Sequence, residues 1–275
     1  MTFRTLLTDG LRTLALNSST TSWLTKQSFV DVTADEQGGA VLMYHTVGEE
    51  YPKREALPKP VFRKHLEFLT TNYDPVDFRQ LLNPATNSSN SVALTFDGGY
   101  ADFYSAILPL LREFDVPATV FVVPERVGQV NGQPAGATKW VDWFDFMTHE
   151  HICELINDPL IQIGNKTLTH DYPLPELPDD ELEREIVQGK QALEQEYSIS
   201  IDSFCYPRGQ YDKRTVKLVR DHHEYAVITR PDFVNSSTDN ALIPRFTADW
   251  KTVADLREML TNAYVLEQNF RRIIS

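Results

Sequence analysis

The chain has 275 residues, of which 41% are hydrophobic and 24% are charged, and its formal net charge is −13 at pH 7. This length is sufficient for a full hydrophobic core, and the composition is that of an ordinary globular protein. The strongly negative charge argues against binding to DNA, RNA or anionic membranes, which select basic surfaces.

Residues 1–39 are mixed in character and end in a polar run, and they are predicted to form an N-terminal extension that packs on the main domain. From residue 40 onward, short apolar strands alternate with segments of helical spacing. Strands are expected at 40–44, 92–96, 117–123, 161–164, 203–206 and 225–229. Helices are expected at 61–69, 102–114, 141–156, 178–197, 212–223 and 253–274, and Pro109 should bend the second of these.

This alternation of strands and helices indicates a parallel α/β sheet. The number of strands suits a closed or partly closed barrel, which we expect to occupy residues 40–275 as one domain. The two cysteines, Cys153 and Cys205, form neither a disulfide framework nor a CxxC pair. Because the N-terminal apolar runs are broken by Arg, Thr and Asp, they fit neither a signal peptide nor a membrane helix. We therefore expect a cytoplasmic protein without a membrane span.

Polar side chains follow several of the predicted strands at the point where each strand ends. Asp97 ends one strand and is followed by two glycines, His170 lies after another, and His45 follows the first. The turn 206–209, Tyr-Pro-Arg-Gly, follows a further strand. In a parallel barrel such positions share one rim, which is where ligand sites form.

Each of these positions allows two interpretations. Asp97 could act as a general base, or it could form an Asx-turn or helix cap. His170 could be a metal ligand or an acid/base group, or a hydrogen-bonded structural residue. The turn 206–209 could present a backbone N–H to a developing oxyanion, or it could be a turn and nothing more.

Between about residues 41 and 245 the sequence resembles the polysaccharide deacetylase family, which includes chitin, chitooligosaccharide and peptidoglycan deacetylases. Segment 95–100 (T-F-D-G-G-Y) resembles the first family motif, T-F-D-D-G-Y. Segment 163–170 resembles the second, in which H-[ST]-x-x-H supplies two histidines, and 204–212 resembles the third, Y-P-Y-G-x-Y-D. Weaker matches are the opening strand 41–45, the strand 117–122 and the Leu-Pro-Arg-like element 243–245.

The resemblance implies a distorted (β/α) barrel of the polysaccharide deacetylase type that hydrolyses the amide of N-acetylated amino sugars. In such enzymes one Asp is the general base, while a second Asp and two His hold a divalent metal such as zinc. The metal polarises the acetyl carbonyl and activates a water molecule. Asp97 matches the general base and His170 matches one metal ligand.

Two positions of the metal site depart from the family pattern. Gly98 stands where the family has its metal-binding Asp, and Lys166 stands where it has the first His. Since a catalytic zinc usually has three protein ligands, we expect no cofactor unless the family site is partly retained. The activity should therefore be weakened or absent. Arg208 stands where the family often has an aromatic residue.

Lys166 could compensate for the lost metal site in charge. Its +1 charge equals the sum of the charges of the missing divalent metal and the missing Asp. We hypothesise that its ammonium pairs with Asp97 and binds an anion or a carbonyl oxygen. The alternative is that the site has drifted after losing its role. At the level of function, the alternative to a weakened deacetylase is a non-catalytic glycan-binding pseudoenzyme that acts in a polysaccharide pathway.

The predicted site therefore has two groups of residues, and its expected ligand is an N-acetylated oligo- or polysaccharide. The predicted catalytic residues are Asp97, Lys166, His170 and Arg208, with His170 also the surviving metal ligand. The predicted substrate-binding residues are His45, Tyr100, Tyr206 and Arg245.

Overall fold

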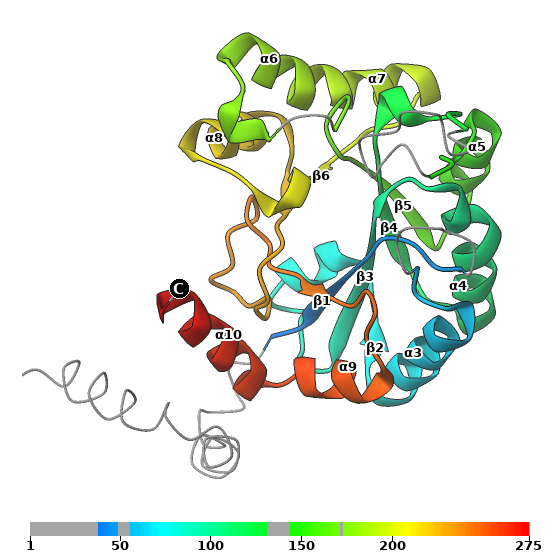
Figure 1. Ribbon diagram of the computed structural model, residues 1–275, viewed down its shortest axis with the longest axis vertical. Helices are drawn as coiled ribbons and strands as arrows, with labels where there is room; N and C mark the ends of the chain where they lie inside the picture. Colours follow the sequence, from blue (N-terminus) through cyan, green and yellow to red (C-terminus); the bar gives the residue numbers. More distant parts are fainter. Residues whose placement is uncertain (1–37, 49–55, 131–143, 171–172, 275) are drawn as a thin grey trace, which may run out of the picture. The chain divides into compact units, whose positions relative to one another are not determined.

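The structure is a computed structural model that describes residues 38–48, 56–130, 144–170 and 173–274 (Figure 1). Gly38–Leu260 forms one compact unit. Helix α10 (Asn262–Ile274) belongs to a second unit and is considered by itself. The predicted N-terminal extension lies outside the described residues apart from positions 38 and 39.

Parallel strands form a single curled sheet in Gly38–Leu260 (Figure 1). The strand order is β7-β6-β5-β4-β3-β1-β8, with β2 paired to β3, and each pairing between these strands is parallel. The strands are β1 (Ala40–Tyr44), β2 (Asp74–Pro75), β3 (Ser91–Gly98), β4 (Ala118–Val122), β5 (Ile161–Asn165), β6 (Ser203–Cys205), β7 (Tyr225–Val227) and β8 (Phe246–Thr247). The sheet is a half-barrel, so the prediction of a partly closed parallel barrel is confirmed.

Helices cover the outside of this sheet, with α3, α4 and α5 following one another along one side in Figure 1. The helices of the unit are α3 (Lys59–Asn72), α4 (Leu108–Phe114), α5 (His149–Ile156), α6 (Asp179–Glu183), α7 (Gly189–Tyr197), α8 (Lys213–His222) and α9 (Val253–Met259). None of the helices in the described part of the chain is both long and apolar enough to cross a bilayer.

One helix prediction was wrong at its start, and another helix contains a turn of a different type. Helix α5 begins at His149 and not at 141, because the Thr148 side chain caps it and 144–148 are not helical; residues 141–143 lie outside the described part. The predicted helix 102–114 is helical throughout, with a π-helical turn, Phe103–Ile107, directly before α4, and Pro109 follows that turn. The Leu108 N–H bonds to the carbonyl of Phe103, so Pro109 lies within a continuous helix where the hydrogen-bond pattern is locally distorted.

Of the other two long predicted helices, one contains a π-helical turn and the other is interrupted. The predicted helix 178–197 consists of α6, a π-helical turn (Arg184–Gln188) and α7. The predicted helix 253–274 divides into α9 and α10, because Leu260 leaves the helical backbone region at ψ 41°. Strands β2 and β8, of two residues each, are too short to give a period-two pattern and were missed.

Much of the interior of the half-barrel is apolar. A cluster of buried residues from β1, β3, β4, β6 and β7 and their connections fills it, namely Val41, Phe78, Leu81, Ala93, Phe121, Cys205, Val227, Val234 and Ile243. This cluster fixes the strands relative to one another, so the residues at their carboxyl ends are held on a rigid base. The candidate site lies at those ends.

Candidate functional site

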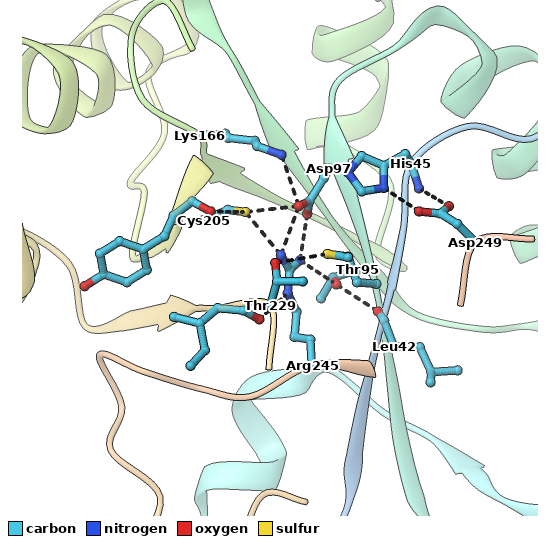
Figure 2. A network of polar contacts seen from close by, with 12 residues as sticks. Leu42, His45, Thr95, Asp97, Lys166, Cys205, Thr229, Arg245 and Asp249 are labelled. Carbon is cyan, nitrogen blue, oxygen red and sulfur yellow. Dashed lines mark hydrogen bonds and ion pairs between the residues drawn. The ribbon is translucent and has the colours of Figure 1, made fainter. Parts of the chain in front are cut away.

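Three parallel strands bring the central residues of the site together. Asp97 is the next-to-last residue of β3, Lys166 directly follows β5, and Cys205 is the last residue of β6. Carboxyl ends of parallel strands meet on one rim, so residues far apart in sequence become neighbours here. Figure 2 shows Lys166 and Cys205 directed toward Asp97, with Arg245 approaching the same carboxylate from another side.

Arg245 binds both oxygens of Asp97. Its Nη1 lies 2.6 Å from Oδ1 and its Nη2 lies 2.9 Å from Oδ2, which is a bidentate pair. Further guanidinium hydrogen bonds go to Thr95 Oγ1 (3.0 Å) and to the carbonyl of Ile228 (3.2 Å). Arg245 is 0% exposed and lies 5.8 Å from the ring centroid of Phe121, so the guanidinium is part of the barrel interior.

Lys166 adds a second cation to the same carboxylate. Its Nζ donates to Asp97 Oδ2 at 3.1 Å, and the side chain is only 4% exposed. The backbone N–H of Lys166 bonds to the carbonyl of Val122 at 2.8 Å, which continues the β4–β5 ladder and fixes the origin of the side chain. The hypothesised pairing of Lys166 with Asp97 is therefore present.

These contacts set the protonation of the centre. Burial alone would raise the pKa of Asp97, but the charges of Arg245 and Lys166 and the guanidinium hydrogen bonds outweigh it and hold that pKa well below its usual range. The Cys205 thiol donates to Asp97 Oδ2 at 3.2 Å. Burial and the Asp97 charge raise the pKa of Cys205 to about 11. At neutral pH the centre thus contains an ionised carboxylate, two cations and a neutral thiol.

The loop that carries Lys166 and His170 is held by a buried carboxylate on the helix behind it. Glu185, in the π-helical turn, accepts from the backbone N–H of Leu168 (3.2 Å) and of Thr169 (3.0 Å) and from the Thr169 hydroxyl (2.9 Å). His170 has a left-handed backbone (φ 59°). Burial and the Lys166 charge lower the pKa of His170 to about 3, so its imidazole is neutral.

His45 and Asp249 form a second polar pair beside the first, as Figure 2 shows. The imidazole Nδ1 of His45 lies 2.6 Å from Asp249 Oδ2, and the backbone N–H of His45 donates to Oδ1 at 2.9 Å. Asp249 is buried, while the His45 side chain is 15% exposed. The buried carboxylate therefore orients an imidazole that is partly exposed.

The other predicted site residues are placed differently from the expectation. Arg245, expected to bind substrate, is fully buried and bonds to protein atoms. Tyr100 is buried in an aromatic cluster with Phe144 and Phe146. Tyr206 is 1% exposed and packs between the rings of Phe204 and Tyr211.

Arg208 also lies apart from the Asp97 centre. It occupies a 3-10 turn, Pro207–Gly209, with a left-handed backbone (φ 56°), and it is exposed. Within the described residues it shares no hydrogen bond or ion pair with Asp97, Lys166 or Arg245. Its predicted catalytic role has no contact in support.

Gly98 has a conformation that suits no other residue well. Its φ is +111°, and a Cβ built there would lie 2.5 Å from Cε2 and 2.7 Å from Cζ of the Tyr100 ring. The ring of Tyr100 thus occupies the volume where a side chain at position 98 would begin. A carboxylate at this position would require the ring to move within its aromatic cluster.

The residues present do not fit the divalent metal that the family resemblance implies. No cluster of three or more His, Cys, Asp and Glu side chains suited to a metal occurs among the described residues. At the family position, Lys166 has no lone pair to donate when protonated, and Gly98 has no side chain. His170 alone supplies a neutral nitrogen, and Asp97 already accepts from two cations.

Three contributors to the site were not predicted from the sequence. Asp249 follows β8, a strand of two residues without a recognisable pattern. Cys205 and Thr95 were noted only as an unpaired cysteine and a motif residue, although both contact Arg245. The available signal was their position at or near strand ends, the same signal that identified Asp97.

Comparisons with known proteins agree with this architecture. The sequence pattern of the polysaccharide deacetylase family matches residues 85–227, just over half of the chain. The chain is 24% identical over 197 residues to the Bacillus subtilis protein named "Putative polysaccharide deacetylase YxkH", covering 70% of this chain and 64% of that protein. It is 24% identical over 172 residues to the poly-beta-1,6-N-acetyl-D-glucosamine N-deacetylase of Escherichia coli K12, covering 58% of this chain and 26% of that protein. The chain thus spans less than two thirds of either relative.

Solved structures show the same fold. IcaB from Ammonifex degensii superposes with a TM-score of 0.69 at 22% identity, covering 83% of this chain and 97% of that chain. A polysaccharide deacetylase from Bacillus cereus, BC0361, gives a TM-score of 0.66 at 19% identity, covering 82% and 70%. The family pattern, together with the motifs that converge on Asp97, shows that the chain belongs to the polysaccharide deacetylase family.

Proposed function

We propose that this protein is a carbohydrate-binding member of the polysaccharide deacetylase family that does not carry out the family's metal-assisted hydrolysis. Its ligand is proposed to be an N-acetylated oligo- or polysaccharide, the class on which the matched Escherichia coli protein acts by name. The observation that carries the proposal is the contact of Lys166 Nζ with Asp97 Oδ2 at 3.1 Å. It puts a cationic side chain at a family metal-ligand position.

Two features of the centre argue against hydrolysis. The charges of Arg245 and Lys166 hold the pKa of Asp97 well below its usual range against the effect of burial, so the carboxylate is a weak proton acceptor. An ammonium also cannot lower the pKa of a bound water to near neutrality as a metal ion does. The proton acceptor and the nucleophile are thus both weakened, although the half-barrel and its rim are retained.

A residual deacetylase is the second candidate, and the His45–Asp249 pair favours it. A partly exposed imidazole that is oriented by a buried carboxylate is suited to hydrogen-bond a ligand or to transfer a proton to a leaving amine. Asp97, which is ionised on the other side, is the second acid/base group that slow hydrolysis would use. Binding without turnover and slow turnover are therefore the two outcomes to be separated.

Calorimetry with fully acetylated N-acetylglucosamine oligomers, paired with an enzymatic assay for released acetate, separates them. We expect saturable binding that is unchanged by a chelator and no acetate above the uncatalysed background. Elemental analysis of the protein is expected to find no stoichiometric transition metal. Acetate release that the chelator abolishes would refute the proposal. Chelator-independent release that is lost in His45→Ala would establish the residual deacetylase.

A further inference from the structure

A second buried carboxylate lies close to the His45–Asp249 pair. Asp102 directly precedes the π-helical turn Phe103–Ile107 and is 7% exposed. Its Oδ2 accepts from the backbone N–H of Val47 at 2.5 Å, which connects the helical segment after β3 to the segment after β1. Val47 follows His45 by two residues, so Asp102 holds the same short segment that carries the imidazole.

Hydrogen bonds hold this short segment, residues 45–48, on both of its sides. Leu57 exchanges two backbone hydrogen bonds of 3.0 Å with it. The N–H groups of residues 45 and 47 are bound instead by the carboxylates of Asp249 and Asp102. The position of the imidazole therefore depends on two buried carboxylates from different parts of the chain.

The groups that face Asp102 in the described part of the chain are backbone N–H groups and one further carboxylate. The N–H groups are those of Val47, of Asp102 itself and of Phe103, and the carboxylate is that of Asp249. Asp102 Oδ1 has no hydrogen-bond partner among these described residues. Burial and the Asp249 charge raise the pKa of Asp102 to about 7, although the N–H groups oppose this shift. The charge of the carboxyl group therefore changes around neutral pH.

We propose that Asp102 is a positioning residue for His45 that makes ligand binding at this imidazole depend on pH. The inference rests on the proposed function, because it takes His45 as a group that binds the sugar, and it deepens that function by naming its regulation. When Asp102 is ionised, two neighbouring carboxylates act on the segment, and a nearby negative charge favours the protonated form of an imidazole. Because Nδ1 of His45 bonds to Asp249, the added proton lies on Nε2, where it can be donated to an oxygen of the ligand.

Calorimetry with fully acetylated N-acetylglucosamine oligomers at pH 6 and pH 8 tests this inference. At pH 6 Asp102 is mostly protonated, so the native protein and Asp102→Asn, which keeps an oxygen for the Val47 N–H, should bind alike. At pH 8 the native protein should bind about fivefold more tightly than Asp102→Asn, which is the low end of couplings between two sites. Asp221→Asn, which removes an exposed carboxylate paired with Lys217 on α8, should bind like the native protein at both pH values.

Two results of this experiment would overturn the inference. One is equal binding by the native protein and Asp102→Asn at pH 8, which would show that the charge of Asp102 does not reach the imidazole. The other is undiminished binding by Asp102→Ala, which leaves the Val47 N–H without its acceptor and should bind more weakly at both pH values.

A measurement without ligand separates failure of this inference from failure of the proposed function. NMR spectra recorded between pH 5.5 and pH 8.5 should show a transition centred at about pH 7 at the Val47 amide and also at the His45 amide. Both transitions should be absent in Asp102→Asn. If the native protein binds no sugar but shows these transitions, the proposed function is refuted and only the positioning of His45 stands. If either amide lacks the transition, the inference is overturned whatever sugars bind.

Discussion

The bidentate pair of Arg245 and Asp97 gives the sharpest prediction for stability. Arg245→Met removes the guanidinium but keeps an unbranched apolar side chain in the barrel interior. Removing one partner of a buried ion pair costs about 3 to 5 kcal/mol, because the other charge stays buried without its counterion. Lys166, 3.1 Å from Asp97, still compensates in part. We therefore expect a loss of about 3 kcal/mol in the free energy of unfolding at pH 7.5.

The loss should depend on pH with a defined sign. In the native protein the pKa of Asp97 is depressed, so the pair contributes stability above the unfolded-state pKa near 4 and loses it as the pH falls through the depressed value. In Arg245→Met, burial should raise the pKa of Asp97, and stability should fall as the pH rises through that raised value. The difference between the two proteins should therefore be smaller at pH 4.5 than at pH 7.5.

Urea unfolding followed by tryptophan fluorescence measures both quantities. The matched control is Arg220→Met, which removes the surface partner of Asp239. The side chains of Arg220 and Asp239 are 54% and 37% exposed. Pairs of this kind contribute less than about 1 kcal/mol, so the control should change little at either pH. An Arg245→Met effect no larger than that of the control, or one equal at both pH values, would refute this account of the Asp97 centre.

Two further predictions concern buried carboxylates near the site. Burial raises the pKa of Asp102 to about 7, so the folded protein keeps a proton that the unfolded chain releases, and stability falls as the pH rises from about 4 to 7. The side-chain oxygen of Asp102→Asn can still accept from the Val47 N–H. This variant should therefore be more stable than the native protein at pH 8 by about 2 to 4 kcal/mol. Urea unfolding should show a smaller gain at pH 5, and an equal gain at both pH values would contradict the prediction. Glu185→Ala leaves the buried N–H groups of the loop after Lys166 without an acceptor and should cost about 2 to 3 kcal/mol. Glu183→Ala, on the exposed face of the same segment, should cost under about 0.5 kcal/mol, and equal losses would show that the loop does not depend on Glu185.

The strand ends of the site could be predicted from the sequence because they depend on local patterns. An apolar run that stops at a carboxylate, as at Asp97, marks the end of a buried parallel strand whatever the rest of the chain does. The closeness of Lys166 and Asp97 followed from parallel topology and the family motifs. Both predictions depended on where the strands end. Neither depended on how side chains pack.

The roles of Arg245 and Asp249 could not be predicted in the same way. Arg245 reaches a carboxylate 148 positions away in the chain, and Asp249 reaches an imidazole 204 positions away. Such contacts depend on packing in the barrel interior and have no periodic signal in the sequence. The π-helical turn that presents Glu185 is equally hidden, because its residues continue the pattern of an ordinary helix.

The burial of Arg245 also bears on how a site of this kind changes in evolution. A guanidinium sealed inside the barrel requires a carboxylate partner, so any substitution of Asp97 would first impair folding, whether or not a reaction takes place at that position. Loss of a metal ligand faces no such barrier. An ancestral proton acceptor can therefore persist long after turnover has ceased. Its presence in a sequence indicates that the barrel folds, and does not by itself indicate an enzyme.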